Sequence, residues 1–211
     1  MNRPLPHIGS ARHTFFVTLS LAGALPTEAA VRLRAEYDAD IAGLNEAGRA
    51  ESLSADLQIL RKRYFSKFDD LLHANTTVPK WLSADPVAEA VREAIMFRNG
   101  SLFELHACTL MPNHVHMLFT PRTAGEGGPP LEFVSTMLTN LKRLTARKAN
   151  QIIGSSGAFW ETGSFDLLVS DSRELSRIND FILQNPVRAG LVTEWHHWRW
   201  SYSRFTSRKS T

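Results

Sequence analysis

The order of strand-forming and helix-forming segments is the feature that most constrains the fold of this chain. Residues 103–110 and 114–120 have the composition of strands and follow one helical segment directly. With an early strand around Phe15, the predicted order is strand, helix, strand, strand, helix, strand, helix. That order is typical of an α+β layer fold.

The length and composition allow one well-buried domain, because the chain has 211 residues and is 43% hydrophobic. We predict a single domain, 1–211, with a helical insertion at 27–82, a core at 101–192 and an aromatic and basic tail at 193–211. Cys108 is the only cysteine, which excludes an internal disulfide and fits a reducing cytosol. No segment has the length of a membrane span, so we expect a soluble, cytoplasmic protein.

The charge is nearly balanced, with 24 Lys and Arg against 21 Asp and Glu, so net charge alone does not indicate nucleic acid. The basic excess lies in the last third of the chain. Its densest row, on a predicted helix, is Lys142, Arg143, Arg147 and Lys148. Such a row could follow a phosphate backbone, although a solvated helix face predicts the same pattern.

The most informative local motif is His114-Val115-His116, within a predicted strand. Side chains two apart on a strand point to the same face, so the two imidazoles lie side by side. They are a ready pair of metal ligands, but a divalent ion needs at least one further donor. Taken alone, the pair fits two polar residues on a half-exposed strand equally well.

A final helix is predicted after Asp171, which forms a capping-box pattern with Glu174. We expect this helix to stop at Asn185, because Pro186 disfavours helical geometry in the residue before it.

Several segments, in this order, make the chain resemble the REP-associated tyrosine transposases of the HUH superfamily. They are FFVT at 15–18, MPNHVH at 111–116, LKRLTARKAN at 141–150, GAFW at 157–160 and INDFILQNPVRAGLV at 178–192. The resemblance implies a ferredoxin-like HUH fold, an antiparallel sheet with helices packed on it. It implies single-stranded or hairpin DNA of the REP type as partner, and a monomer or homodimer.

The resemblance also implies a metal site and a nucleophile. In that family a histidine pair and a residue of the later helix hold a divalent metal, Mg or Mn, and a tyrosine attacks the DNA phosphorus. The matching ligands are His114, His116 and Asn185. Arg188, close to this site in the sequence, is the best single phosphate-binding candidate.

The main departure from the family is Phe181, which occupies the position of the tyrosine one helical turn before Asn185. Phenylalanine has no oxygen to bond to phosphorus, and removal of a nucleophile costs other enzymes roughly a millionfold in turnover. A second departure is Ser164-Phe165-Asp166-Leu167, where many members have Tyr-Asp-His. Asp166 is either a surface carboxylate, the preferred interpretation, or an extra metal ligand.

These residues favour a transposase-like protein that recognises single-stranded or hairpin DNA and has impaired strand cleavage. One alternative is an active metal-dependent single-strand endonuclease that uses water, or one of Tyr37, Tyr64 and Tyr202, in place of the missing hydroxyl. Another is a regulatory interaction module that inherited the fold and no longer binds DNA.

Overall fold

The computed structural model describes residues 13–46, 53–74, 78–122 and 131–205. They belong to two compact units, one of residues 22–79 and one that combines residues up to 21 with those from 80 onward. Each unit is described by itself.

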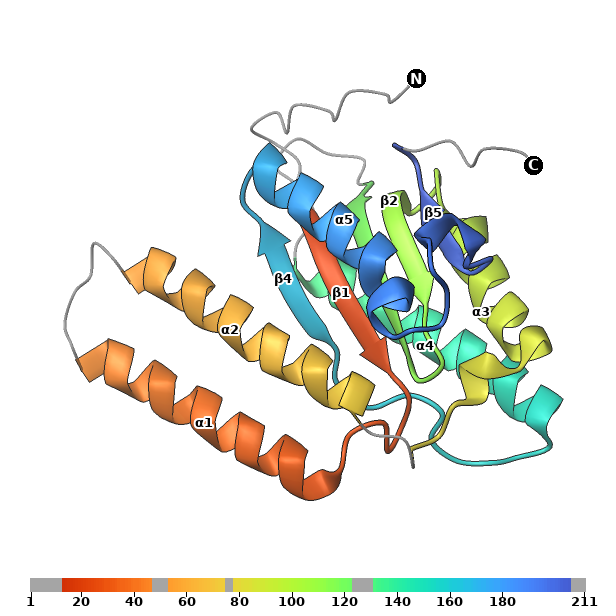
Figure 1. Cartoon of the computed structure of the whole chain (residues 1–211), viewed down its shortest axis with the longest axis horizontal. Helices are drawn as coiled ribbons and strands as arrows, with labels where there is room; N and C mark the ends of the chain where they lie inside the picture. The colour runs from red at the N-terminus through yellow and green to blue at the C-terminus, as the bar shows by residue number, and fades with distance from the viewer. Residues whose placement is uncertain (1–12, 47–52, 75–77, 123–130, 206–211) are drawn as a thin grey trace. The chain divides into compact units, whose positions relative to one another are not determined.

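The larger unit is built on a five-stranded sheet with the strand order β4-β1-β3-β2-β5 (Figure 1). Each pair of neighbouring strands is antiparallel. The strands are β1 Thr14–Ser20, β2 Phe103–Leu110, β3 His114–Pro121, β4 Phe165–Val169 and β5 Ser201–Ser203. The predicted α+β class, with an antiparallel sheet and packed helices, is therefore confirmed.

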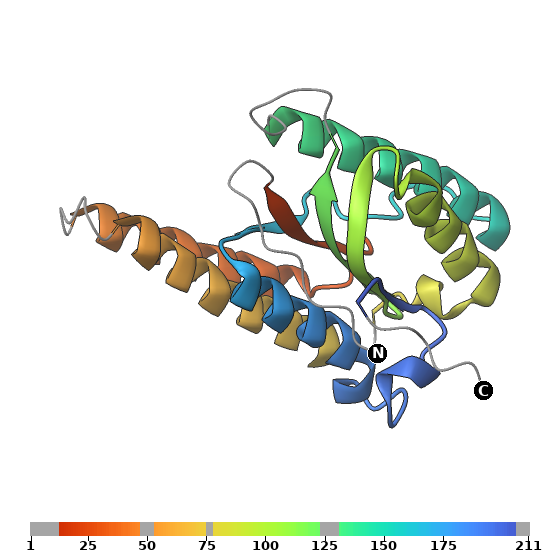
Figure 2. The same ribbon diagram turned by 90° about the horizontal axis from the view of Figure 1, so that it is seen from above.

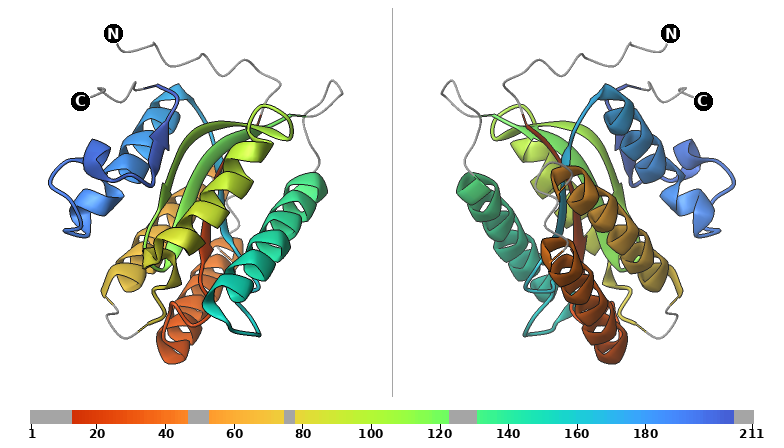
Figure 3. Two further views of the ribbon diagram at one scale, coloured as in Figure 1. Left: turned by 90° about the vertical axis from the view of Figure 1, so that its right-hand side faces the viewer. Right: turned by 90° about the vertical axis from the view of Figure 1, so that its left-hand side faces the viewer.

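Helices cover both faces of this sheet. Two lie on one face and one on the other (Figures 2 and 3). The pair on one face is α3, Asp85–Arg98, and α4, Leu131–Ile153, and the helix on the opposite face is α5, Ser172–Arg188. Among the described residues, no helix is both long enough and apolar enough to cross a bilayer.

The two faces of the sheet differ in chemistry. Because side chains alternate along a strand, the registers assign each residue to one face. The face toward α3 and α4 is apolar, with Phe15, Val17, Leu19, Phe103, Leu105, Val115, Met117 and Phe119 buried. The face toward α5 carries buried polar side chains, namely Thr14, Thr18, His106, Thr109, His114, His116, Thr120, Ser201 and Ser203.

Helix α5 begins as predicted but ends later. The Asp171 carboxylate caps it by accepting the backbone N–H of Glu174 at 2.7 Å. The prediction that the helix stops at Asn185 is wrong, because it continues through Pro186 to Arg188. Pro186 removes one helical hydrogen bond, but the ladder resumes with the Ala189 N–H donating to the Asn185 carbonyl at 3.0 Å. Burial of Pro186 also stabilises this last turn.

The smaller unit is a pair of helices, α1 Thr27–Glu46 and α2 Leu53–Ala74. The rings of Tyr37 and Tyr64 lie 4.5 Å apart between their centroids, and Arg63 and Asp40 form an ion pair across the two helices. Residues 47–52, which connect the two helices, lie outside the described residues. How the chain divides into domains stays a prediction.

Candidate metal centre

The two histidines of the motif converge on the face of the sheet toward α5. Both lie on β3, and both are 0% exposed. The Nε2 atoms of His114 and His116 are 3.1 Å apart. The strand therefore places both imidazoles as the alternation of the sequence predicts, with their Nε2 atoms directed at one point.

Asn185 of α5 reaches the same point. Its Nδ2 lies 3.2 Å from the Nε2 of His116, and its side chain is also 0% exposed. These two residues are 69 positions apart in the chain. The structure thus brings together the three residues that the resemblance implied as metal ligands.

The outer nitrogen of each imidazole has a partner of its own. The Nδ1 of His114 lies 2.8 Å from Asn113 Oδ1, and the Nδ1 of His116 lies 2.8 Å from Thr18 Oγ1. Such outer partners fix the tautomer and the ring orientation of metal-binding histidines. Each ring is therefore held through its Nδ1, on the side away from the pair of Nε2 atoms.

Neither of these partners was singled out from the sequence. Asn113 directly precedes the motif, and Thr18 is a polar residue within an otherwise apolar strand. These two sequence features identify Asn113 and Thr18 as partners of the histidines only when the pairing of β1 with β3 is known.

The donor set fits a divalent cation. Imidazole nitrogens are common ligands of divalent ions, and the Nε2 atoms of His114 and His116 lie 3.1 Å apart. This separation matches two adjacent ligands that each lie about 2.1 Å from one metal at roughly a right angle. The Asn185 side chain also has an oxygen that could serve as a third ligand.

Phe181 lies beside these ligands, one helical turn before Asn185. Its ring centroid is 5.4 Å from that of His116 and 6.0 Å from that of Phe16. The Arg188 guanidinium carbon lies 5.2 Å from the Phe181 ring centroid, a cation–π distance. The ring therefore packs at the position expected of the nucleophile, with no oxygen to present.

Tyr202 is on the wrong face of the sheet to replace that oxygen. In β5 it is the register partner of Cys108, and Cys108 in turn pairs with Met117. Because Met117 is adjacent to His116 on β3, their side chains point to opposite faces. Tyr202 and the histidines are therefore separated by the sheet.

Asp166 also faces away from the histidines. It pairs with Val17, and Val17 pairs with Met117 on the apolar face. Its side chain is exposed at the edge strand β4. This position agrees with a surface carboxylate and places it outside the ligand group.

The predicted basic row lies on α4, on the opposite face of the sheet from the histidines (Figure 2). Arg143, Arg147 and Lys148 are exposed there. Of the predicted DNA-binding residues, Arg188 is the one on α5, the helix that carries Phe181 and Asn185. The structure therefore does not bring the α4 row together with the candidate metal centre.

Lys142 differs from its neighbours in the row because its ammonium group is engaged within the protein. It donates to the carbonyl of Glu161, and to those of Thr162 and Gly163 at 2.9 Å each. Burial lowers the pKa of Lys142 from its usual value. This residue ties α4 to the loop that precedes β4.

The solved structures that are similar to this chain include the following two. One is a REP-associated tyrosine transposase bound to a REP hairpin, with 15% identity, a TM-score of 0.45, and coverage of 95% of this chain and 80% of that chain. The other is a proposed transposase from Deinococcus radiodurans, with 12% identity, a TM-score of 0.39, and coverage of 87% and 98%. No family model matches the chain, and no curated protein matches it. Similarity of this degree assigns neither an activity nor a ligand.

Proposed function

We propose that this protein binds DNA as a transposase-type protein, recognises single-stranded or hairpin DNA such as REP-type elements, and is impaired in strand cleavage. The observation that carries the proposal is the packing of Phe181 against His116, one turn from Asn185. The three candidate ligands lie together, while the neighbouring position has a ring without an oxygen.

The residues of the site would have separate roles. His114, His116 and Asn185 would hold Mg²⁺ or Mn²⁺, and such an ion, when bound, polarises a phosphodiester. The outer partners Thr18 and Asn113 keep the imidazoles oriented. Arg188 is exposed at the end of α5 and would hold a DNA phosphate next to the Phe181 ring.

A second candidate function is a metal-dependent nuclease in which water replaces the missing hydroxyl. It is favoured by the histidine pair, because two imidazoles that meet at their Nε2 atoms could hold an ion that activates water. The two functions differ in their products. Water would give free DNA ends, whereas a tyrosine gives a covalent protein–DNA adduct.

Gel-shift titrations at several salt concentrations test the binding. We expect a hairpin and a single strand to bind more tightly than a duplex of the same length. Arg188→Gln should weaken the binding, while Arg177→Gln, with the same charge change three turns earlier on α5, should have a smaller effect. Absent binding, or equal binding to all three DNAs, would contradict the proposal.

Phe181→Tyr tests the loss of cleavage. With Mn²⁺ and a labelled single strand we expect the variant to form a covalent adduct at position 181, and the unmodified protein to form none. Phe181→Leu is the matched control, because it changes the ring without adding an oxygen. Free ends produced by the unmodified protein would instead establish the water-dependent nuclease.

A further inference from the structure

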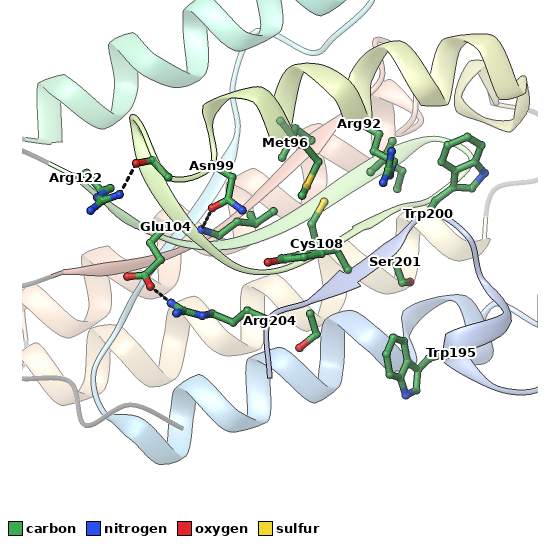
Figure 4. Close-up of a pocket in the computed structure, with 16 residues that line it drawn as sticks. Arg92, Met96, Asn99, Glu104, Cys108, Arg122, Trp195, Trp200, Ser201 and Arg204 are labelled. Atoms are coloured by element: carbon green, nitrogen blue, oxygen red, sulfur yellow. Dashed lines mark hydrogen bonds and ion pairs between the residues drawn. The ribbon is translucent and has the colours of Figure 1, made fainter. Parts of the chain in front are cut away.

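A pocket of about 860 Å³ opens between α3 and the strands β2 and β5, at the edge of the sheet where Ser201 and Ser203 of the polar face also line it (Figure 4). Cys108 and Tyr202, register partners on those two strands, both line it. They lie on the face opposite to His116, as their pairing with Met117 shows. The pocket is therefore a site separate from the candidate metal centre.

Arginines reach this pocket from three segments of the chain. Arg92 comes from α3, Arg122 follows β3, and Arg204 follows β5. Among the lining residues Glu104 is the one carboxylate, and it forms an ion pair with Arg204. Three guanidinium groups against one carboxylate leave an excess of two positive charges, so the pocket favours an anion.

All three arginines have a partner in the protein. Arg204 pairs with Glu104, Arg122 donates to the Gly100 carbonyl, and Arg92 pairs with Glu89 outside the pocket. Arg92 contacts Glu89 at 2.9 Å, with side chains 45% and 39% exposed. Exposed pairs of this kind contribute little, so Arg92 can exchange this partner for a ligand phosphate. A guanidinium binds phosphate in a two-pronged geometry.

The remaining walls combine aromatic and apolar side chains with the polar Asn99, Ser201 and Ser203. Trp195 and Tyr202 are both partly exposed at the pocket, whereas Trp200 is buried and has the Arg199 guanidinium carbon 4.4 Å from its ring centroid. Met96 adds a polarizable surface from α3. Partly exposed aromatic rings next to arginines are the surface on which nucleic-acid bases stack.

A metal ion is a poor occupant of the same space. Burial raises the pKa of the Cys108 thiol to about 12, so this sulfur stays protonated and is a weak ligand. The Glu104 carboxylate is already paired with Arg204. The volume, in contrast, falls within the range of roughly 300 to 1,000 Å³ that is usual for organic ligands.

We propose that this pocket binds a nucleotide, with its phosphate held by the arginines and its base against Trp195 and Tyr202. The same chemistry is offered by a free nucleotide and by an unpaired nucleotide in a DNA strand. The proposal does not depend on the metal centre, and either site can fail experimentally without the other.

Calorimetric titration of the full chain in EDTA tests it without contribution from a metal. The probes are deoxyadenosine 5′-monophosphate, inorganic phosphate and a single-stranded trinucleotide. Arg92→Gln should weaken nucleotide binding about tenfold, by loss of one charged hydrogen-bond donor. Arg98→Gln is the matched control, because Arg98 lies on the same helix but donates to the Ala94 carbonyl of its own helix.

The outcomes separate the two sources of the ligand. Equal affinity for the mononucleotide and the trinucleotide supports a free nucleotide, and a much tighter trinucleotide supports a DNA strand. The proposal is overturned if neither binds, or if inorganic phosphate binds as tightly as the mononucleotide. It is also overturned if Arg92→Gln and Trp195→Leu both leave the affinity unchanged, with folding of each variant checked by circular dichroism.

Discussion

The two faces of the same sheet are built for different purposes. Toward α3 and α4, the rings of Phe15, Phe103 and Phe119 pack on one another. The ring centroid of Phe119 lies at a distance of 6.3 Å from that of Phe15 and 5.2 Å from that of Phe103. Toward α5, buried hydroxyl and imidazole groups are held in pairs, such as Thr14 with Thr120 at 2.8 Å. The first arrangement removes apolar surface from water, and the second orients polar atoms.

This difference indicates where stability and function reside. Buried apolar area contributes about 25 cal/mol per Å², whereas a buried polar group contributes little even when it is satisfied and costs about 1 to 3 kcal/mol when it is not. The apolar face should therefore supply most of the folding free energy. Burial of the polar face costs more free energy, and this face carries the candidate metal ligands.

Phe119→Ala and Thr120→Val compare the two faces at adjacent residues of β3. Phe119→Ala should lower the free energy of unfolding by about 3 to 5 kcal/mol, because it leaves a cavity among aromatic rings. Thr120→Val should cost about 1 to 3 kcal/mol, because it deprives Thr14 and His106 of a partner. Urea denaturation measures both, and equal losses would contradict the contrast between the faces.

Acid should destabilise the protein through His106, which belongs to the polar face. Its Nε2 contacts Thr120 Oγ1 at 2.7 Å, and burial lowers its pKa to about 4. The unfolded chain, with a pKa near 6.5, binds the proton first as the pH falls. This contribution to stability is complete above about pH 6.5, and up to about 3 kcal/mol is lost as the pH falls to about 4.

The variant His106→Gln isolates this effect, since glutamine keeps a polar atom but does not titrate. Unfolding measured from pH 7 to pH 4 should show a shallower loss of stability in this variant. The exposed His197→Gln should retain the steep loss. An unchanged slope in His106→Gln would place the acid sensitivity elsewhere.

Metal binding should depend on the polar face alone. His116→Ala removes one of the converging Nε2 atoms, and we expect the Mn²⁺ affinity to fall by about 100-fold or more, since loss of an outer partner alone costs 10-fold to 100-fold in metal sites. Calorimetry with Mn²⁺ measures it, with His197→Ala as control. Nucleotide binding at the pocket should be unchanged by His116→Ala, and a parallel loss would mean that the two faces are not independent.

The fold could be predicted from the sequence wherever a short local pattern decides it. The strand-like composition of 103–110 and 114–120 predicts β2 and β3 within one residue of their observed ends, because a run of strand formers bounded by turn residues is a local signal. The predicted end of α5 at Asn185 rests only on the tendency of a proline to keep the residue before it out of a helix. The helix continues through residue 186 because that residue is buried. Long-range packing is absent from a local pattern.

The candidate site shows the same limit. The spacing of His114 and His116 predicts that they share a face of the strand. The resemblance implies Asn185 as the third ligand. The bond between Thr18 and His116 joins residues 98 positions apart, and the separation of the α4 basic row from the site requires knowledge of which helix covers which face. The residues that line the pocket come from segments as far apart in the sequence as Arg92 and Arg204. No local sequence motif therefore predicts it.

The smallest expected effect concerns the hydroxyl that orients His116. In register, His116 lies between Thr18 on β1 and Thr109 on β2. Thr18 Oγ1 contacts the imidazole, whereas Thr109 Oγ1 contacts Ser201 Oγ at 3.0 Å. Thr18→Val should therefore reduce Mn²⁺ affinity about tenfold by freeing the ring, and Thr109→Val, the same change on the same face, should leave it unchanged. Equal losses in the two variants would show that the polar face acts on the metal through general packing and not through this one hydrogen bond.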